Sequence, residues 1–223
     1  MSLILYSSAL SLFSREVEIA LGEKGLEFER IMVPFTQERG YQPKHPVVLA
    51  ANPKAQVPVL TDGDLTLFDS TVIFEYLEDA YPEPALYPKG AAARGRCRLI
   101  ELTADEIILP LVAKLMYRTE PPNPDPALQQ KAEADGTQAE AALVAKWVEL
   151  DADLNGRDWF CEDFSVADIA MFMTLVFARR LSAPPWDTLE NLNAWFTRME
   201  SRPAPARAAA ETAAADRELS PQK

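Results

Sequence analysis

Residues 52–77 read NPKAQVPVLTDGDLTLFDSTVIFEYL, and this stretch carries the strongest signals for the fold. Two apolar runs, 57–61 and 65–68, flank an Asp-Gly pair at 62–63, which is a strong indication of a β-hairpin. Directly after the hairpin, residues 70–80 place apolar side chains at helical spacing. The stretch therefore predicts two antiparallel strands followed at once by a helix.

The residues upstream complete a small α/β unit. Residues 3–6 (LILY) and 28–33 (FERIMV) are candidate strands, and a helical pattern over 14–25 lies between them. Residues 34–47 hold three prolines and show no clear period, so we expect a long, irregular connection there. A strand-helix-strand order implies a parallel pair with a right-handed crossover, and the hairpin adds an antiparallel pair. We therefore expect a mixed four-stranded sheet.

The residues downstream are helical in pattern. Residues 81–90 (YPEPALYPKG) are rich in proline and predict an extended linker. Pro110 predicts a kink or break in the helix that follows, residues 166–178 are apolar almost all round, and the tail from about 203 is expected to be partly ordered at best. The expected organisation is an α/β domain, a linker and an all-helical domain, at residues 1–81, 82–90 and 91–223.

Composition excludes several classes of protein. The chain has 223 residues, 48% apolar and 25% charged, which is typical of a globular protein rather than a disordered one. No apolar run approaches the roughly 18 residues of a membrane span, and the N-terminus lacks the basic residues of a secretory signal. A net charge of −12 disfavours nucleic-acid binding. Cys97 and Cys161 show no metal or redox spacing, and His45 is the only histidine, so we expect a cytoplasmic protein with reduced thiols and no metal.

Four motifs have both a structural and a chemical interpretation. LYSSALS (5–11) places serine hydroxyls between a strand and a helix, where they can cap the helix or donate to a bound anion; Ser14 is the expected N-cap. The proline of QVPVL (56–60) is unusual in a strand and indicates an edge, a bulge or a cis bond. Ser70 is expected to cap the helix after the hairpin, or to present its hydroxyl to a carboxylate ligand. SVAD (165–168) is typical of a capping box that begins a buried helix.

Taken in this order and spacing, the four motifs and the proline-rich linker resemble the cytosolic glutathione transferase superfamily over essentially the whole chain. The match is to bacterial, serine-type members. The resemblance implies a thioredoxin-like N-terminal domain, a helical-bundle C-terminal domain, a homodimer, and glutathione as co-substrate. No cysteine lies near residues 8–14, which argues against the cysteine-type members.

The resemblance also implies which residues bind glutathione. Pro58 matches a cis-proline that exposes Val57 to pair with the cysteinyl unit, while Asp69 and Ser70 match the pair that holds the γ-glutamyl group. Gln56 matches a position that contacts the tripeptide. Lys44 or His45 falls near positions that meet the glycine carboxylate. His45 has an alternative interpretation as a surface histidine.

The catalytic hydroxyl implied by the resemblance is that of Ser11, with Ser14 as its rival, and Ala9 and Leu12 stand where many members have proline. The expected reaction is attack of the glutathione thiolate on a small apolar electrophile. The residues expected to form the apolar wall of the electrophile pocket are Leu10, Leu12, Leu111, Leu115 and Tyr117. The alternatives are a non-enzymatic interaction protein on the same scaffold, and a glutathione-dependent isomerase or dehalogenase.

Overall fold

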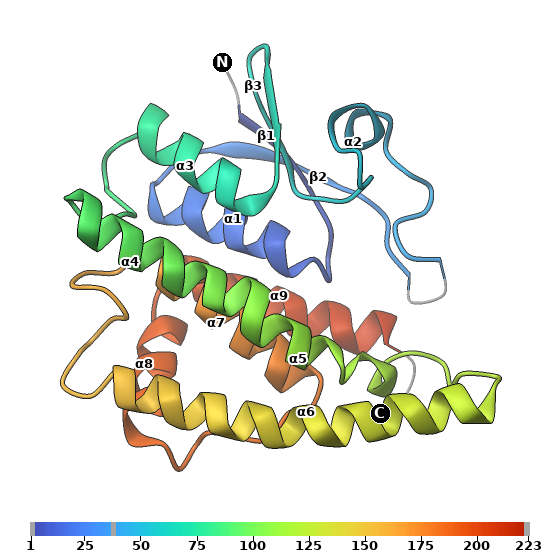
Figure 1. Ribbon diagram of the computed structural model, residues 1–223. Coiled ribbons are helices and arrows are strands. Elements are labelled where there is room, and N and C mark those ends of the chain that lie inside the picture. The colour runs from blue at the N-terminus through green and yellow to red at the C-terminus, as the bar shows by residue number, and fades with distance from the viewer. Residues whose placement is uncertain (1–2, 37–38, 221–223) are drawn as a thin grey trace.

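The computed structural model describes residues 3–36 and 39–220 (Figure 1). Four strands form one sheet in the order β2-β1-β3-β4. Their bounds are β1 (Leu3–Ser7), β2 (Phe28–Met32), β3 (Val59–Asp62) and β4 (Leu65–Phe68). β1 runs parallel to β2 and antiparallel to β3, and β3 pairs antiparallel with β4. The predicted mixed sheet and hairpin are confirmed.

Helices cover both faces of this sheet. α1 (Leu12–Glu23) and α3 (Ser70–Ala80) pack against one face, and α2 (Pro46–Ala51) lies on the other (Figure 1). The alternation of side chains along each strand separates the two cores, because Leu5 belongs to the first and Tyr6 to the second.

The predicted linker is tied to this unit by a buried ion pair. The Lys24 ammonium on α1 donates to Glu78 at 2.9 Å and to the carbonyls of Tyr81 and Pro84. The Glu78 carboxylate also accepts from the backbone N–H of Leu86. Because the ion pair is hydrogen-bonded on both sides, it fixes the path of the chain between α3 and α4.

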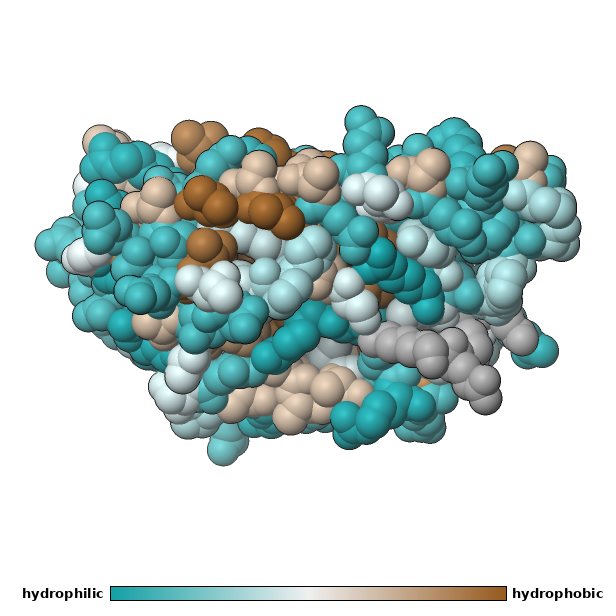
Figure 2. All heavy atoms as spheres, turned by 90° about the horizontal axis from the view of Figure 1, so that it is seen from below, coloured by the Kyte–Doolittle hydropathy of each residue, from teal (hydrophilic) through white to brown (hydrophobic). Residues whose placement is uncertain are grey.

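The rest of the chain is helical, and the break at Pro110 is confirmed. The elements are α4 (Ala91–Leu102), η1 (Thr103–Ile108), α5 (Leu109–Ala113), η2 (Met116–Arg118), α6 (Pro126–Asp153), α7 (Val166–Arg180), α8 (Glu190–Glu200) and α9 (Pro203–Leu219). η1 is a wider, π-helical turn, and α5 begins immediately before Pro110, which has no N–H to continue the α-helical ladder. Seen from below, the face formed by α6 is largely hydrophilic, with apolar side chains gathered in one part of it (Figure 2).

α7 is the buried centre of the helical part, as predicted, and SVAD forms a capping box at its start. The expectation of a poorly ordered tail is wrong, since residues 203–219 form α9. Alanine has the highest helix propensity, and Ala204, Ala208 and Ala209 are small enough to let α9 pack closely. Near its start, the Cβ of Ala204 lies only 2.8 Å from where a Cβ on Gly22 of α1 would be, so this contact requires glycine.

Candidate functional site

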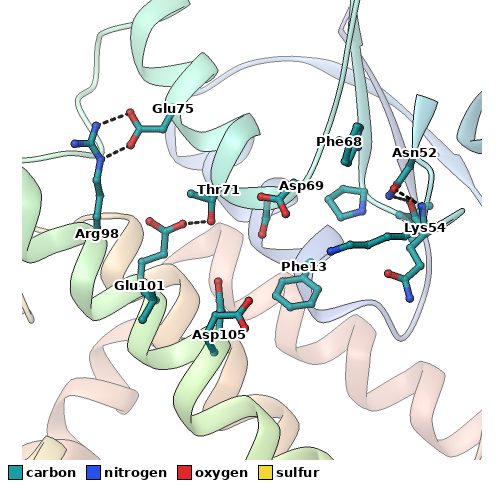
Figure 3. Close-up of a pocket in the computed structure, with 16 residues that line it drawn as sticks. Phe13, Asn52, Lys54, Phe68, Asp69, Thr71, Glu75, Arg98, Glu101 and Asp105 are labelled. Carbon is teal, nitrogen blue, oxygen red and sulfur yellow. Dashed lines mark hydrogen bonds and ion pairs between the residues drawn. The ribbon is translucent and has the colours of Figure 1, made fainter.

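Two adjoining cavities open between the sheet unit and the helices that follow it. The larger has a volume of about 510 Å³ and lies between residues 52–58, the start of α3, and α4 with η1 (Figure 3). The smaller, of about 310 Å³, lies between the start of α1, α5 and the end of α7. Phe13, Gln56 and Val57 line both cavities. The two cavities therefore share a wall.

The Val57–Pro58 bond, which is cis, places two residues at the larger cavity. Both side chains are buried, and Pro58 lies just before β3, where its missing N–H costs the sheet nothing. The turn that leads into the bond is held by Asn52, whose side-chain amide donates to the Gln56 carbonyl at 2.8 Å. Of the three alternatives that the sequence left open, an edge, a bulge and a cis bond, the structure shows the cis bond.

Asp69 and Ser70 line the larger cavity where β4 passes into α3. Asp69, not Ser70, is the N-cap: its carboxylate accepts from the Val72 N–H, and Ser70 is the first residue of the helix. Asp69 has φ 78°, a strained conformation for a residue other than glycine, and such strain gathers at functional sites. The predicted cap is wrong by one residue. The shift leaves the Ser70 hydroxyl to meet a ligand at the helix N-terminus.

A wall of carboxylates faces Asp69 and Ser70 across the larger cavity. Glu101 and Asp105 project from α4 and η1 (Figure 3), and Glu16 lies fully buried in α1 behind them. Burial raises the pKa of Glu101 to about 7, and burial with the charge of Glu101 raises the pKa of Asp105 to about 7. Burial, together with the charges of Asp105 and Glu101, raises the pKa of Glu16 well above its usual value. The Ser70 hydroxyl and the Asp105 carboxyl lie near the Glu16 carboxylate and shift its pKa in opposite directions, Ser70 down and Asp105 up.

These raised pKa values predict a stability that falls as pH rises. Above about pH 4 the unfolded chain has lost its carboxyl protons, while folded Glu101 and Asp105 keep theirs until about pH 7. The free energy of unfolding from these groups therefore decreases between about pH 4 and 7. We expect Asp105→Asn, measured by urea unfolding at pH 5 and pH 8, to reduce this loss by at least about 2 kcal/mol. Equal pH sensitivity of the variant and the wild type would contradict the assignment.

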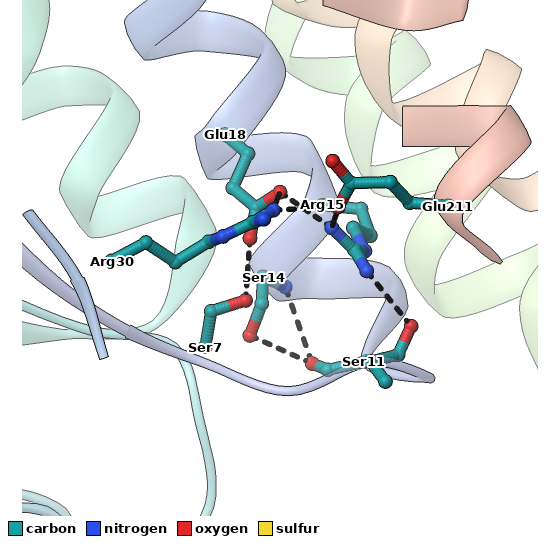
Figure 4. Close-up of polar contacts among 8 residues, drawn as sticks. Ser7, Ser11, Ser14, Arg15, Glu18, Arg30 and Glu211 are labelled. Carbon is teal, nitrogen blue, oxygen red and sulfur yellow. Dashed lines mark hydrogen bonds and ion pairs between the residues drawn. The ribbon is translucent and has the colours of Figure 1, made fainter. Parts of the chain in front are cut away.

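Ser11 lies at the smaller cavity and is the N-cap of α1. Its Oγ accepts two hydrogen bonds from Ser14, at 3.2 Å from the backbone N–H and at 2.9 Å from the hydroxyl (Figure 4). The expectation that Ser14 caps this helix is wrong by one turn. Ser14 is fully buried behind Ser11 and lines neither of the two cavities. Because Ser11 accepts both bonds, its own hydroxyl proton is available to a cavity ligand.

The loop before Ser11 is held by a buried ionic network (Figure 4). The Glu18 carboxylate accepts from Ser7 at 2.6 Å, from Arg15 at 2.7 Å and from Arg30 at 3.1 Å. Both guanidinium groups also reach Glu211 on α9, and Arg15 donates to the Ala9 carbonyl. The network thus joins the end of β1, the start of α1 and the last helix, so Ser11 stands on a rigid support.

The other predicted residues divide between the cavities and the rest of the fold. Leu10 and Leu12 line the smaller cavity as expected. Leu111, Leu115 and Tyr117 do not: Leu115 is fully buried in the core, and the Tyr117 ring lies against Gly136 of α6. The apolar residues of α5 and η2 that do line it are Leu109, Val112, Ala113 and Met116. Successive side chains along a helix point in directions about 100° apart. The apolar pattern in the sequence does not show which of two neighbouring residues faces the cavity.

Lys44 and His45 are also absent from the lining of both cavities. Lys44 donates to the Ala55 carbonyl at 3.1 Å, and His45 is the N-cap of α2 with its ring 4.8 Å from that of Tyr6. The larger cavity is instead lined by two cations, Lys54 and Arg98, and the position of Lys54 in the NPKAQVP motif could have indicated it.

Two polar residues of the smaller cavity were missed from the sequence. Tyr41 lies within hydrogen-bonding reach of Ser11, and burial raises the pKa of its hydroxyl. Arg180, at the end of α7, lines the cavity while its guanidinium pairs with Asp216 at 2.7 Å. Neither residue lies near a recognisable motif, so no local signal could have found them.

Residues 3–36 and 39–220 hold neither a cluster of metal-ligating side chains nor a membrane-spanning helix. In this part of the chain, no group of three or more His, Cys, Asp or Glu side chains is placed to hold a metal ion. Within the same residues, no helix is long and apolar enough to cross a membrane.

The chain matches two family models. Residues 5–85 match the glutathione S-transferase N-terminal domain and residues 104–203 the glutathione S-transferase C-terminal domain. Among solved structures, a glutathione S-transferase from Methylobacillus flagellatus KT with glutathione bound has a TM-score of 0.74 and 27% identity, covering 93% of this chain and 98% of that one. This likeness over nearly the whole chain extends to both parts of the fold.

Two curated relatives have names other than glutathione S-transferase. A stringent starvation protein A homolog from Coxiella burnetii is 34% identical over 75% of this chain and 71% of its own length. A probable maleylacetoacetate isomerase from Vibrio cholerae is 39% identical, but the match spans only about half of each protein. The matched domains, the thioredoxin-like sheet unit with its helical partner and these relatives together show that the chain belongs to the cytosolic glutathione transferase superfamily.

Proposed function

We propose that the protein is a glutathione transferase that binds glutathione across the two cavities. Val57, held by the cis bond to Pro58, pairs main chain to main chain with the cysteinyl unit. Ser70 and the N-terminus of α3 hold the γ-glutamyl carboxylate, and Asp69 holds its ammonium. The proposal is supported by the presence of these residues on one cavity wall and by the glutathione bound to a structurally similar relative.

The carboxylate wall and Lys54 extend this assignment to both ends of the tripeptide. Glu101 and Asp105 lie across the cavity from Asp69 and Ser70 and add negative charge beside the γ-glutamyl ammonium. Lys54 lines the same cavity, as does Gln56, and replaces Lys44 and His45 as the proposed cation for the glycine carboxylate. The charges of the cavity thus complement a zwitterionic head and an anionic tail.

The observation that carries the catalytic part of the proposal is the hydrogen bonding of Ser11. Its oxygen accepts from the backbone N–H of Ser14, so its hydroxyl can donate to the glutathione sulfur at the cavity. Lowering an ordinary thiol pKa of about 8.5 by two units needs roughly 2.7 kcal/mol. A hydrogen bond to a charged group provides about 1.5–3 kcal/mol, and the N-terminus of α1 adds to it. Ser11 and the helix are therefore sufficient to favour the thiolate.

The experiment that tests the proposal is a pH titration of thiolate absorbance for glutathione mixed with the protein. We expect a midpoint about one to two pH units below that of free glutathione. An unshifted midpoint with measurable binding would mean that the protein binds glutathione without activating its thiol. Absence of glutathione binding would favour the interaction-protein alternative, which the starvation-protein relatives also suggest.

Arg180 favours a second candidate within the same chemistry, a glutathione-dependent isomerase of unsaturated carboxylates. Arg180, which is paired with Asp216, lines the smaller cavity together with the Tyr41 and Ser11 hydroxyls, and this set of donors suits a substrate with an anionic group. Addition of the thiolate to a cis double bond, rotation and elimination would give the trans isomer and regenerate glutathione. The name of the Vibrio relative supports this choice. Turnover of a cis-enedioate alongside 1-chloro-2,4-dinitrobenzene would distinguish an isomerase from a transferase for neutral electrophiles.

A homodimer is also part of the proposal. The exposed apolar side chains Leu65, Phe68 and Val72 lie on β4 and α3, and Leu99 and Leu102 lie on the neighbouring α4. The bidentate pair of Arg98 with Glu75, at 2.6 and 2.9 Å, joins α3 to α4. A second copy that covers these residues would remove an apolar surface from water beside the larger cavity.

A further inference from the structure

Cys97 and Cys161 are distant in the sequence but neighbours in the fold. Cys97 is fully buried on α4, and Cys161 is partly exposed on the connection between α6 and α7, which runs beside the start of α4 (Figure 1). Cys161 shares a cavity lining with Arg96 and Ile100 of α4, which flank Cys97, so the two thiols are neighbours that influence each other's charge, and neither is in a disulfide. Cys97 belongs to the hydrophobic core and Cys161 packs against it, so both are packing residues as well as neighbours.

A cavity gives one of the two sulfurs access to small molecules. Cys161 lines a cavity of about 580 Å³ between the start of α4 and the connection at 156–163. Arg96, which precedes Cys97, and Arg157 lie in the same lining. The connection is held in place, because Arg198 donates to the Asp158 carbonyl at 2.7 Å and the Val166 N–H to the Leu86 carbonyl at 2.9 Å. The exposed thiol thus has a fixed position over the buried one.

The surroundings of Cys97 and Cys161 give the two thiols different pKa values and different reactivity. The hydrogen bond from Cys97, aided by the Ser165 hydroxyl and the charge of Arg96, lowers the pKa of Cys161 to about 7 against the opposing effects of burial and of Asp168. The hydrogen bond to Cys161, with burial, raises the pKa of Cys97. A thiol that is accessible and partly ionised at neutral pH reacts with peroxides in solution, whereas a buried, protonated thiol is shielded from them and can react only with a neighbouring group.

We propose that Cys161 is the peroxide-reactive thiol of a reversible dithiol pair and that Cys97 resolves it to a disulfide. The Cys161 thiolate attacks a hydroperoxide: an S–O bond forms, the O–O bond breaks, and the released alkoxide or hydroxide takes a proton from water. Sulfur loses two electrons and the peroxide gains them. The Cys97 sulfur then attacks the sulfenic acid, an S–S bond replaces the S–O bond, and the leaving hydroxide takes the Cys97 proton as water.

The disulfide would tie α4 to the connection that leads into α7. α4 also carries Glu101 in the wall of the larger cavity, so oxidation would stiffen one side of the proposed glutathione site. The pair itself does not depend on glutathione binding, and its test is independent of any activity.

The first experiment exposes the reduced wild-type protein to hydrogen peroxide. We expect both titratable thiols to disappear together, an intact mass lower by two hydrogen atoms, a Cys97–Cys161 cross-linked peptide, and full recovery with dithiothreitol. Cys97→Ser should stop at a sulfenic acid on Cys161 that dimedone traps, and Cys161→Ser should stay unmodified. Persistence of both thiols in the wild type, or equal oxidation of Cys97 in Cys161→Ser, would overturn the proposal.

The second experiment measures the pH dependence of Cys161 alkylation by iodoacetamide in two matched variants. Cys97→Ser keeps a hydroxyl donor and should keep a midpoint near that of the wild type, close to 7. Cys97→Ala loses the donor and should move the midpoint up by about one pH unit. A wild-type midpoint near 8.5, the value of an ordinary thiol, would overturn the assignment of Cys161 as the reactive member.

Discussion

Asp168→Ala is expected to cost the protein about 3–4 kcal/mol of its free energy of unfolding. The Asp168 carboxylate, fully buried at the start of α7, accepts from the backbone N–H groups of Phe160 and Ser165 and from the Trp195 indole. Alanine would leave these donors without partners inside the core. A lost N-cap costs about 1 kcal/mol, and each buried unsatisfied donor adds about 1–3 kcal/mol before relaxation.

Burial of the Asp168 carboxylate is unfavourable, so its hydrogen bonds are needed to offset that cost. Burial raises the pKa of Asp168 to about 6, even though its hydrogen bonds oppose that effect. The side chain joins the 154–165 connection, α7 and α8, and its removal acts on all three at once.

Urea unfolding followed by far-UV circular dichroism measures this effect. Ser165→Ala is the matched control, since it removes one hydroxyl of the same capping box and should cost about 1 kcal/mol. A loss of less than about 1 kcal/mol in Asp168→Ala would mean that water or a shifted side chain replaces the carboxylate.

Ser11→Ala is expected to lower the turnover of the proposed transferase by about ten- to a hundredfold, with little change in glutathione affinity. The hydroxyl bonds mainly to the thiolate, and a hydrogen bond to a charged group is worth about 1.5–3 kcal/mol. The midpoint of the thiolate titration should rise by about one to two pH units in the same variant. The measurements are the titration, the steady-state rate, and the dissociation constant for glutathione.

Ser14→Ala is the matched control, because both serines are buried and lie one turn apart. It removes a hydroxyl that donates to Ser11 but touches neither cavity, so the titration midpoint should stay within about half a unit of the wild type. Loss of the Ser11 cap also costs about 1 kcal/mol of stability, and the rates should therefore be compared well below the unfolding temperature. The reverse pattern would assign the catalytic role to Ser14.

Local sequence patterns predicted the elements of this fold well. Two apolar runs around the Asp-Gly turn predicted the hairpin, and helical spacing predicted α1 and α3, because burial of one side imposes its period on the residues. A stretch that is apolar almost all round predicted α7. The order of the elements then restricted the sheet to a mixed one. Helix α9 was not predicted, because alanine is only weakly apolar. Its alanines pack against the surfaces of α1 and α7, which are known only from the structure.

The sequence pattern could not predict which residue caps a helix or which residue of a helix faces a cavity. The caps of α1 and α3 differ from the expected residues by three positions and by one, and the apolar wall of the smaller cavity comes from Val112 and Met116 rather than Leu115. Along a helix, each step turns the side chain by about 100°, so a small shift moves it from a cavity into the core.

The sequence by itself determined the scaffold and the segment with Pro58, Asp69 and Ser70, because their signals are local. Only the tertiary structure placed Tyr41 and Arg180 at the smaller cavity, gathered Glu16, Glu101 and Asp105, and brought Cys97 to Cys161. These groups come from segments far apart in the chain, and their pKa values depend on burial and on each other's charge. Such properties arise only when the core that excludes water has formed.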